Sequence, residues 1–207
     1  MNQGYWIAIE GLEGAGKSTV CQQLSDWLGR LGIQTVIARE PGGTLLGEQL
    51  RSIIKQGIDN ESLQPMAELL LFYAARAQLL EQIIKPTLQR GDWVISDRHD
   101  LSTQAYQGGG RGVAQSSLEQ LRTLVLEGHR PDLTLYLDIT PEQGLKRAAQ
   151  RGALDRIEQE SLRFFQRIRR RYLELAAADP TVSVIATKGP PGQVFERIQQ
   201  ILSVWLA

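Results

Sequence analysis

The chain has 207 residues, which is enough for one domain with a substantial hydrophobic core. Its 23 acidic and 23 basic residues balance, which argues against the broad basic surface that binds nucleic acids non-specifically. No apolar run is long enough to span a membrane, the first residues lack the pattern of a signal peptide, and the single Cys21 excludes an internal disulfide. We therefore expect a cytoplasmic protein that binds neither nucleic acids nor membranes.

Short apolar runs alternate with helical patterns along the chain. Five apolar runs are predicted to be strands buried on both faces, at residues 5–10, 35–38, 93–96, 133–137 and 182–186. Helical patterns occupy residues 18–31, 44–56, 65–90, 116–127, 141–151, 157–178 and 191–206. This alternation predicts a three-layer α/β fold, with a five-stranded parallel sheet and helices on both faces, in one domain over residues 1–207. Ligands of such sheets bind at the carboxyl ends of the strands.

The first predicted strand runs directly into the glycine-rich segment Gly11-Leu12-Glu13-Gly14-Ala15-Gly16-Lys17-Ser18, which satisfies G-x-x-x-x-G-K-[ST] without a mismatch. Its backbone N–H groups can point into one concavity, and the start of the following helix adds its positive dipole end. Lys17 can then reach the terminal phosphates, and the Ser18 hydroxyl can ligate Mg²⁺. A chance match in a glycine-rich turn is the alternative. The strand before the loop and the helix after it favour a nucleoside triphosphate site.

Two later segments are candidate contacts for a second substrate. Residues 39–44, Arg-Glu-Pro-Gly-Gly-Thr, form a tight loop after the second predicted strand, although a simple turn ending in a Thr cap explains them equally well. Phe72 and Arg76 share one face of a predicted helix, where an aromatic plane and a forked donor could hold a base. A phenylalanine in so apolar a helix also fits plain core packing.

A candidate metal ligand, Asp97, ends the third predicted strand. A carboxylate in this position beside a phosphate loop is the Walker B arrangement, which holds Mg²⁺ directly or through water. An aspartate in a surface turn or at a helix cap is the alternative, and the phosphate loop favours the metal role. The adjacent Arg98 could clamp a phosphate of the acceptor.

Two segments are predicted to be irregular. Residues 108–112 are expected to form a flexible glycine loop, and residues 151–156 form a polar break that suits a lid at about 147–158. A lid arginine would neutralise charge that grows on a transferring phosphoryl group. A solvated helix face is a serious alternative, and Asp155 with Glu158 fits a capping box that opens the next helix. Three arginines flank or occupy the break: Arg147, Arg151 and Arg156.

With these motifs, the chain resembles bacterial thymidylate kinase along almost its whole length. The family pattern recurs in order at residues 10–18, 39–44, 72–76, 97–99, 102–107 and 155–158. The resemblance implies the fold of the phosphate-loop (P-loop) NTPases and a single nucleoside monophosphate kinase domain. It also implies ATP and Mg²⁺ as cofactors, dTMP as the substrate, dTDP as the product, a place in thymidine nucleotide biosynthesis, and a homodimer.

The resemblance assigns roles to individual residues. Contacts with dTMP are implied for Glu40, Arg51, Phe72, Arg76, Arg98, Thr103, Tyr106 and Gln107. Contacts with ATP are implied for Gly11, Leu12, Glu13, Gly14, Ala15, Gly16, Lys17, Ser18, Thr19, Arg147 and Lys188. Ser18 and Asp97 would hold the metal. The implied catalytic residues are Lys17, Arg98 and Arg151.

Within these roles, Phe72 would stack on thymine, and Tyr106 would press on the deoxyribose and disfavour a 2′-hydroxyl. Members of the family take their catalytic arginine either from the phosphate loop or from the lid. The loop interior here contains no arginine, whereas the lid carries Arg151. The resemblance therefore implies the lid-arginine type.

Three other functions are compatible with a phosphate loop. A related kinase could act on another nucleotide or on a small metabolite alcohol, although an alcohol acceptor would need a base near its hydroxyl. A GTP-binding switch is disfavoured because the sequence contains no N-K-x-D, and its D-x-x-G at residues 26–29 falls inside a predicted helix. A catalytically silent nucleotide-binding module is weakened by the intact Lys17, Ser18 and Asp97.

Overall fold

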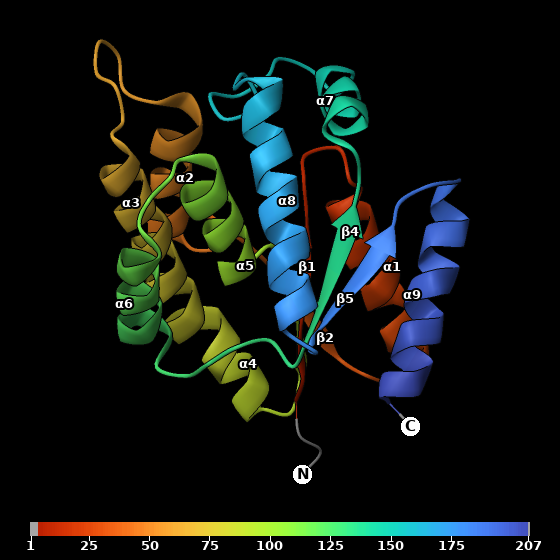
Figure 1. The fold of residues 1–207 in the computed structure, drawn as a ribbon. Helices are drawn as coiled ribbons and strands as arrows, with labels where there is room; N and C mark the ends of the chain where they lie inside the picture. The colour runs from red at the N-terminus through yellow and green to blue at the C-terminus, as the bar shows by residue number, and fades with distance from the viewer. Residues whose placement is uncertain (1–3, 207) are drawn as a thin grey trace.

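The computed structural model describes residues 4–206, which form a three-layer α/β fold around one five-stranded sheet (Figure 1). All neighbouring strands are parallel, and their order is β2-β3-β1-β4-β5. The predicted sheet is therefore confirmed. The strands are β1 (Trp6–Gly11), β2 (Thr35–Arg39), β3 (Trp93–Asp97), β4 (Leu133–Asp138) and β5 (Val182–Ala186).

Helices cover both faces of the sheet, with α1 and α9 on one side in Figure 1 and α3, α4, α6 and α8 on the other. The longer helices are α1 (Lys17–Arg30), α2 (Leu45–Gln56), α3 (Pro65–Leu79), α6 (Gln115–Leu126), α7 (Pro141–Ala149), α8 (Leu162–Ala178) and α9 (Pro191–Trp205). Shorter pieces are the π-helical segment η1 (Leu80–Ile84), α4 (Lys85–Gln89), α5 (Asp100–Thr103) and the π-helical segment η2 (Gln104–Gly110). Across residues 4–206, every helix is too short or too polar to cross a membrane.

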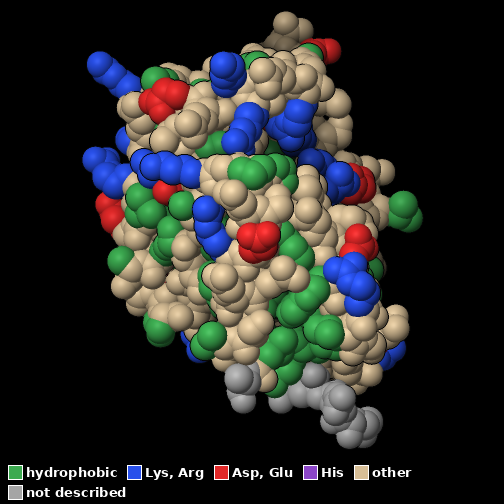
Figure 2. All heavy atoms as spheres, turned by 90° about the vertical axis from the view of Figure 1, so that its right-hand side faces the viewer, with side chains coloured by type: hydrophobic (Ala, Val, Ile, Leu, Met, Phe, Trp, Pro, Cys, Tyr) green, Lys and Arg blue, Asp and Glu red, His purple; other side chains and the backbone are tan. Residues whose placement is uncertain are grey.

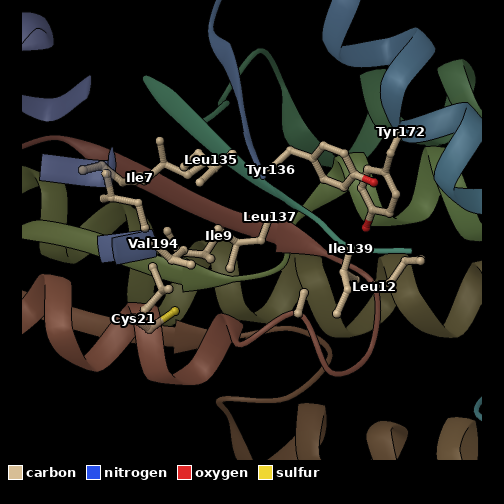
Figure 3. Close-up of a cluster of buried hydrophobic side chains, with 14 of the residues drawn as sticks. Ile7, Ile9, Leu12, Cys21, Leu135, Tyr136, Leu137, Ile139, Tyr172 and Val194 are labelled. Atoms are coloured by element: carbon tan, nitrogen blue, oxygen red, sulfur yellow. The ribbon is translucent and has the colours of Figure 1, made fainter. Parts of the chain in front are cut away.

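The core follows the two-residue periodicity of the strands. Ile7 and Ile9 of β1 belong to a cluster that includes Cys21 of α1 and Val194 of α9 (Figure 3). The alternate residue Trp6 packs in a second cluster with side chains from α3, η1 and β3. Because helices cover both faces of the sheet, the central strands are held in fixed register. Their carboxyl ends, which carry the candidate site, are therefore fixed relative to one another.

The two edge strands differ from the prediction. Ile37 on β2 is 43% exposed and Val184 on β5 is 48% exposed, so the prediction that all five strands are buried on both faces is wrong for these two. The order β2-β3-β1-β4-β5 places both at the outside of the sheet, where each has a neighbouring strand on one side only.

Two predicted helices differ from the observed ones by more than one or two residues at an end. The π-helical segment η1 interrupts the helix predicted at 65–90. It lies immediately before α4, which has Pro86 in its first turn. Proline has no N–H and clashes with the preceding helical turn, which a wider π-helical turn accommodates. The helix predicted at 157–178 begins instead at Leu162, where the Ser161 side chain caps it by accepting a hydrogen bond from the N–H of Phe164.

The glycine stretch at 108–112 is not a flexible loop, because residues 104–110 form η2 and pack against α8. A Cβ at Gly109 would lie 2.6 Å from the Cβ of Arg171, and one at Gly110 would lie 2.6 Å from the ring of Phe164. These glycines therefore allow η2 and α8 to approach each other closely.

Candidate active site

A cavity of about 210 Å³ lies where β1 and β3 end, and it brings together most of the predicted site residues. The predicted residues that line it are Glu13, Lys17, Ser18, Glu40, Arg51, Phe72, Arg76, Asp97, Arg98, Thr103, Tyr106, Gln107 and Arg151. Its lining does not include Gly11, Leu12, Gly14, Ala15, Gly16, Thr19, Arg147 or Lys188. On the face shown in Figure 2, Lys and Arg side chains gather toward the upper end, the end at which β4 and β5 finish in Figure 1. Positive charge at this end suits a ligand with phosphate groups.

The phosphate loop is shaped by its backbone. Gly16 has a φ of 94° and caps α1 without a side-chain hydrogen bond, which leaves N–H groups of the first turn available to an anion. The side chains of Leu12 and Ala15 are buried in the core. Residues of this loop can thus meet a phosphate through their main chain while their side chains anchor the loop.

Lys17 is held close to the loop. Its Nζ donates hydrogen bonds to the carbonyl oxygens of Gly11, at 3.1 Å, and Leu12, at 2.9 Å. Burial, together with the positive charge of Arg98, lowers the pKa of Lys17 to about 8. An incoming polyphosphate would place negative charge beside the ammonium group of Lys17.

The two predicted metal ligands are neighbours. The Ser18 hydroxyl donates a 2.8 Å hydrogen bond to Oδ2 of Asp97, although the two residues come from α1 and β3. Hydroxyl and carboxylate oxygens are the hard donors that Mg²⁺ takes, and Mg²⁺ commonly uses one or two protein groups together with substrate phosphates. This donor pair fits Mg²⁺, the metal that the resemblance implies.

Arg98 lies against the phosphate loop, where its Nη1 donates to the carbonyl oxygen of Gly11 at 3.0 Å. Its guanidinium donates to Oε1 of Glu13 at 2.7 Å and lies over the ring of Tyr106, at 5.0 Å from the centroid. Burial alone would lower the pKa of Arg98, but Tyr106 and Glu13 raise it well above its usual value. The side chain, which is 16% exposed, therefore stays charged in its partly buried site, as an anion-binding group must.

A buried cluster surrounds Arg76. Its Nε donates to Oε2 of Glu40 at 2.7 Å, and its Nη2 donates to Oγ1 of Thr103 at 2.9 Å. Nδ1 of His99 lies 2.8 Å from the other oxygen of Glu40. Burial acts to raise the pKa of Glu40, but Arg76 and His99 lower it, so Glu40 is an anion that fixes Arg76.

Phe72 is half-buried and lines the cavity, whereas the fully packed aromatic residue of this helix is the neighbouring Tyr73. The interpretation of Phe72 as plain core is therefore wrong. Arg51 reaches the same cavity from α2, and its Nη1 donates to the carbonyl oxygen of Pro41 at 2.7 Å.

The lid predicted at about 147–158 corresponds to a non-helical stretch over residues 150–161. Arg151 is 64% exposed and donates to Glu158 at 2.8 Å. Asp155 and Glu158 do exchange the hydrogen bonds of a capping box, but they do so within a turn that precedes α8. Arg147 belongs to α7 and donates to the carbonyl oxygen of Gly14 at 3.3 Å.

Arg156 has a different position from the other lid arginines. Its side chain pairs with the buried Glu68 and donates to the carbonyl oxygen of Ile54 at 3.0 Å. The preceding Asp155 pairs with Lys55 at 2.8 Å. These contacts fasten the lid stretch to the end of α2 and leave Arg151 as the lid arginine that lines the cavity.

Sequence reasoning missed three buried polar groups beside the cavity: Glu10, Ser102 and Tyr172. One signal was present, because a carboxylate in the apolar run of β1 is costly unless it is paired. The partners were hidden, because they lie 92 and 162 residues away in the sequence.

Comparison with known proteins agrees with this geometry. A model of the thymidylate kinase family matches residues 9–198. The crystal structure of thymidylate kinase from Ehrlichia chaffeensis is similar, with a TM-score of 0.79 and 31% sequence identity over 97% of this chain and 99% of that chain. The chain therefore belongs to the thymidylate kinase family, whose members use ATP to phosphorylate dTMP.

Proposed function

We propose that the cavity transfers the γ-phosphoryl group of ATP to dTMP, with ADP and dTDP as products. The observation that carries this proposal is the convergence of the phosphate loop, Asp97, Arg98 and the Arg76 cluster on one cavity. The acceptor phosphate is itself an anionic nucleophile at neutral pH, so the reaction requires no general base. The protein aligns two phosphates and neutralises their repulsion.

For the donor side, we propose that the phosphate loop from Gly11 to Thr19 holds the ATP phosphates through its backbone and Lys17. Ser18 and Asp97 would hold Mg²⁺, which neutralises phosphate charge when bound. Arg147 and Lys188 are proposed contacts for the adenine side. The hydrogen bond from Arg147 to Gly14 supports its placement beside the loop.

For the acceptor side, we propose that Phe72 stacks on thymine while Arg76 and Thr103 bond its edge. Arg98 and Arg51 would hold the phosphate, Tyr106 would contact the deoxyribose, and Gln107 would lie nearby. Glu40 is proposed to act through Arg76, since both of its carboxylate oxygens have protein partners.

For the transition state, we propose that Arg151 of the lid neutralises the transferring phosphoryl group, as in the lid-arginine type of the family. Its exposed side chain on a stretch that already lines the cavity supports this role. A closed lid would also keep water from taking the phosphoryl group.

We also propose that the protein is a cytoplasmic homodimer. Apolar side chains on the adjacent helices α3 and α6 are exposed, with Leu70 at 48% and Leu124 at 74%, which suits a partner surface. Cys21 is buried and free, as is usual in a reducing compartment. Sedimentation equilibrium across a range of protein concentrations tests the dimer.

The metal assignment predicts a change in magnesium dependence. Asp97→Asn keeps one oxygen but removes the charge, so the Mg²⁺ concentration for half-maximal rate should rise by about tenfold or more. Titration of the rate with Mg²⁺ at constant free ATP measures this. Asp92→Asn, outside the cavity lining, is the control and should match the parent. An unchanged titration in Asp97→Asn would remove Asp97 from the metal site.

The lowered pKa of Lys17 predicts a pH dependence of ATP binding. Below pH 8 the ammonium form predominates in the free enzyme, and above pH 8 a proton must be taken up before the phosphates are bound. The Kd for ATP should therefore rise by roughly tenfold between pH 7 and pH 9. Calorimetry over this range measures it. Lys17→Arg stays charged throughout, so its Kd should be constant, and a flat profile in the parent protein would contradict the prediction.

A further inference from the structure

The carboxylate of Glu10 is completely buried, yet it is not part of the proposed phosphate transfer. Its Oε1 accepts hydrogen bonds from the backbone N–H of His99, at 2.8 Å, and of Ser102, at 3.1 Å. Its Oε2 accepts from the Ser102 hydroxyl at 2.6 Å and from the Tyr172 hydroxyl at 2.9 Å. Four donors from two distant segments converge on one carboxylate, which compensates for its burial. Glu10, Ser102 and Tyr172 are called the Glu10 anchor below.

The Glu10 anchor lies beside Arg98 and contacts one end of its guanidinium. The backbone N–H of Arg98 donates to the carbonyl oxygen of Ile9 at 2.9 Å, and its φ of 74° is a conformation that residues other than glycine rarely adopt. Nη1 of Arg98 then donates to the Ser102 hydroxyl at 3.0 Å and to the Tyr172 hydroxyl at 3.5 Å. The same two hydroxyl groups therefore contact both the buried carboxylate and the guanidinium.

Tyr172 reaches this anchor from α8, the helix that follows the lid. Its ring is stacked on Tyr136 of β4, with centroids 4.7 Å apart and an angle of 17° between the planes (Figure 3). The hydroxyl of Tyr136 bonds instead to Asp138 at 3.2 Å. Core packing thus fixes the Tyr172 ring, and only its hydroxyl takes part in the polar anchor.

We propose that Tyr172 is a positioning residue that, with Glu10 and Ser102, holds the Arg98 guanidinium ready for the acceptor phosphate. Nη1 donates to the Ser102 and Tyr172 hydroxyl groups of the anchor and to the carbonyl oxygen of Gly11 at 3.0 Å, while Nη2 donates to Glu13 in the cavity lining. A guanidinium fixed before the ligand arrives loses less conformational freedom on binding. This inference rests on the proposed role of Arg98 as the phosphate clamp.

Tyr172→Phe tests the proposal because it removes the hydroxyl and leaves the stacked ring. Calorimetry should compare dTMP with thymidine, which has the same base and sugar but no phosphate. We expect the Kd for dTMP to rise roughly tenfold while the Kd for thymidine is unchanged. Tyr136→Phe removes the other hydroxyl of the stack and should leave both Kd values as in the parent protein.

A double-mutant cycle shows whether the effect passes through Arg98. In an Arg98→Ala background, Tyr172→Phe should weaken dTMP binding no further. If Arg98→Ala weakens dTMP binding but Tyr172→Phe does not, or weakens dTMP and thymidine equally, the positioning role is overturned. If Arg98→Ala itself binds dTMP as tightly as the parent, the proposed clamp fails, and the positioning role fails with it.

Discussion

Arg151→Ala should lower kcat by roughly 10³-fold while the Kd values for ATP and dTMP change little. The guanidinium is exposed in the free protein and bonded only to Glu158 among the described residues, so it contributes little to ground-state binding. In the proposed role, its interaction would strengthen as charge develops on the transferring phosphoryl group. The side chain reaches the cavity from a stretch that Arg156 and Asp155 fasten to α2.

Single-turnover kinetics with equilibrium binding of both nucleotides measures the Arg151 effect. Arg151→Lys should recover part of the rate, because it keeps the charge but loses the forked donor. Arg170→Ala on α8, exposed and outside the cavity lining, is the matched control. An unchanged rate in Arg151→Ala would exclude a catalytic role for the lid arginine.

Arg98→Ala should lower kcat/KM for dTMP by roughly 10³-fold and leave the Kd for ATP nearly unchanged. The substitution removes the charged fork that is proposed to hold the acceptor phosphate, and it leaves Glu13 without its 2.7 Å partner. The Glu13 carboxylate would keep the hydrogen bond from the Tyr106 hydroxyl but lose its positive partner, so it would then repel the acceptor phosphate as well.

A second substitution separates these two effects of Arg98. Arg98→Ala combined with Glu13→Gln removes the repulsion, so it should recover part of the dTMP affinity. Steady-state rates with varied dTMP, together with a melting temperature for each variant, measure this. Arg90→Ala, outside the cavity lining, should match the parent. Equal kcat/KM values for Arg98→Ala and the parent would contradict the clamp.

The sheet and the phosphate loop could be predicted from the sequence because their signals are local. The spacing of Gly11, Gly16 and Lys17 specifies the loop, and the apolar runs specify the strands. Helix ends were harder to predict where tertiary contacts decide them. The glycines of η2 have the composition of a loop, yet they form a helical segment because α8 packs against it.

The contacts of the site could be predicted only in part. Helical spacing placed Phe72 and Arg76 on one face, but it could not decide whether Phe72 faces a ligand cavity or the core. The position of Asp97 after a strand predicted its proximity to Ser18. The link between Glu10 and Tyr172 could not be predicted, because it joins residues 162 positions apart through a helix packed on the sheet.

A steady-state assay of ADP release with ATP, Mg²⁺ and a panel of nucleoside monophosphates tests the central claim most directly. The account predicts that dTMP gives by far the highest kcat/KM, that dTDP forms in equal amount to ADP, and that thymidine and small alcohols give no turnover. Rapid turnover of another monophosphate, with dTMP left unconverted, would contradict it.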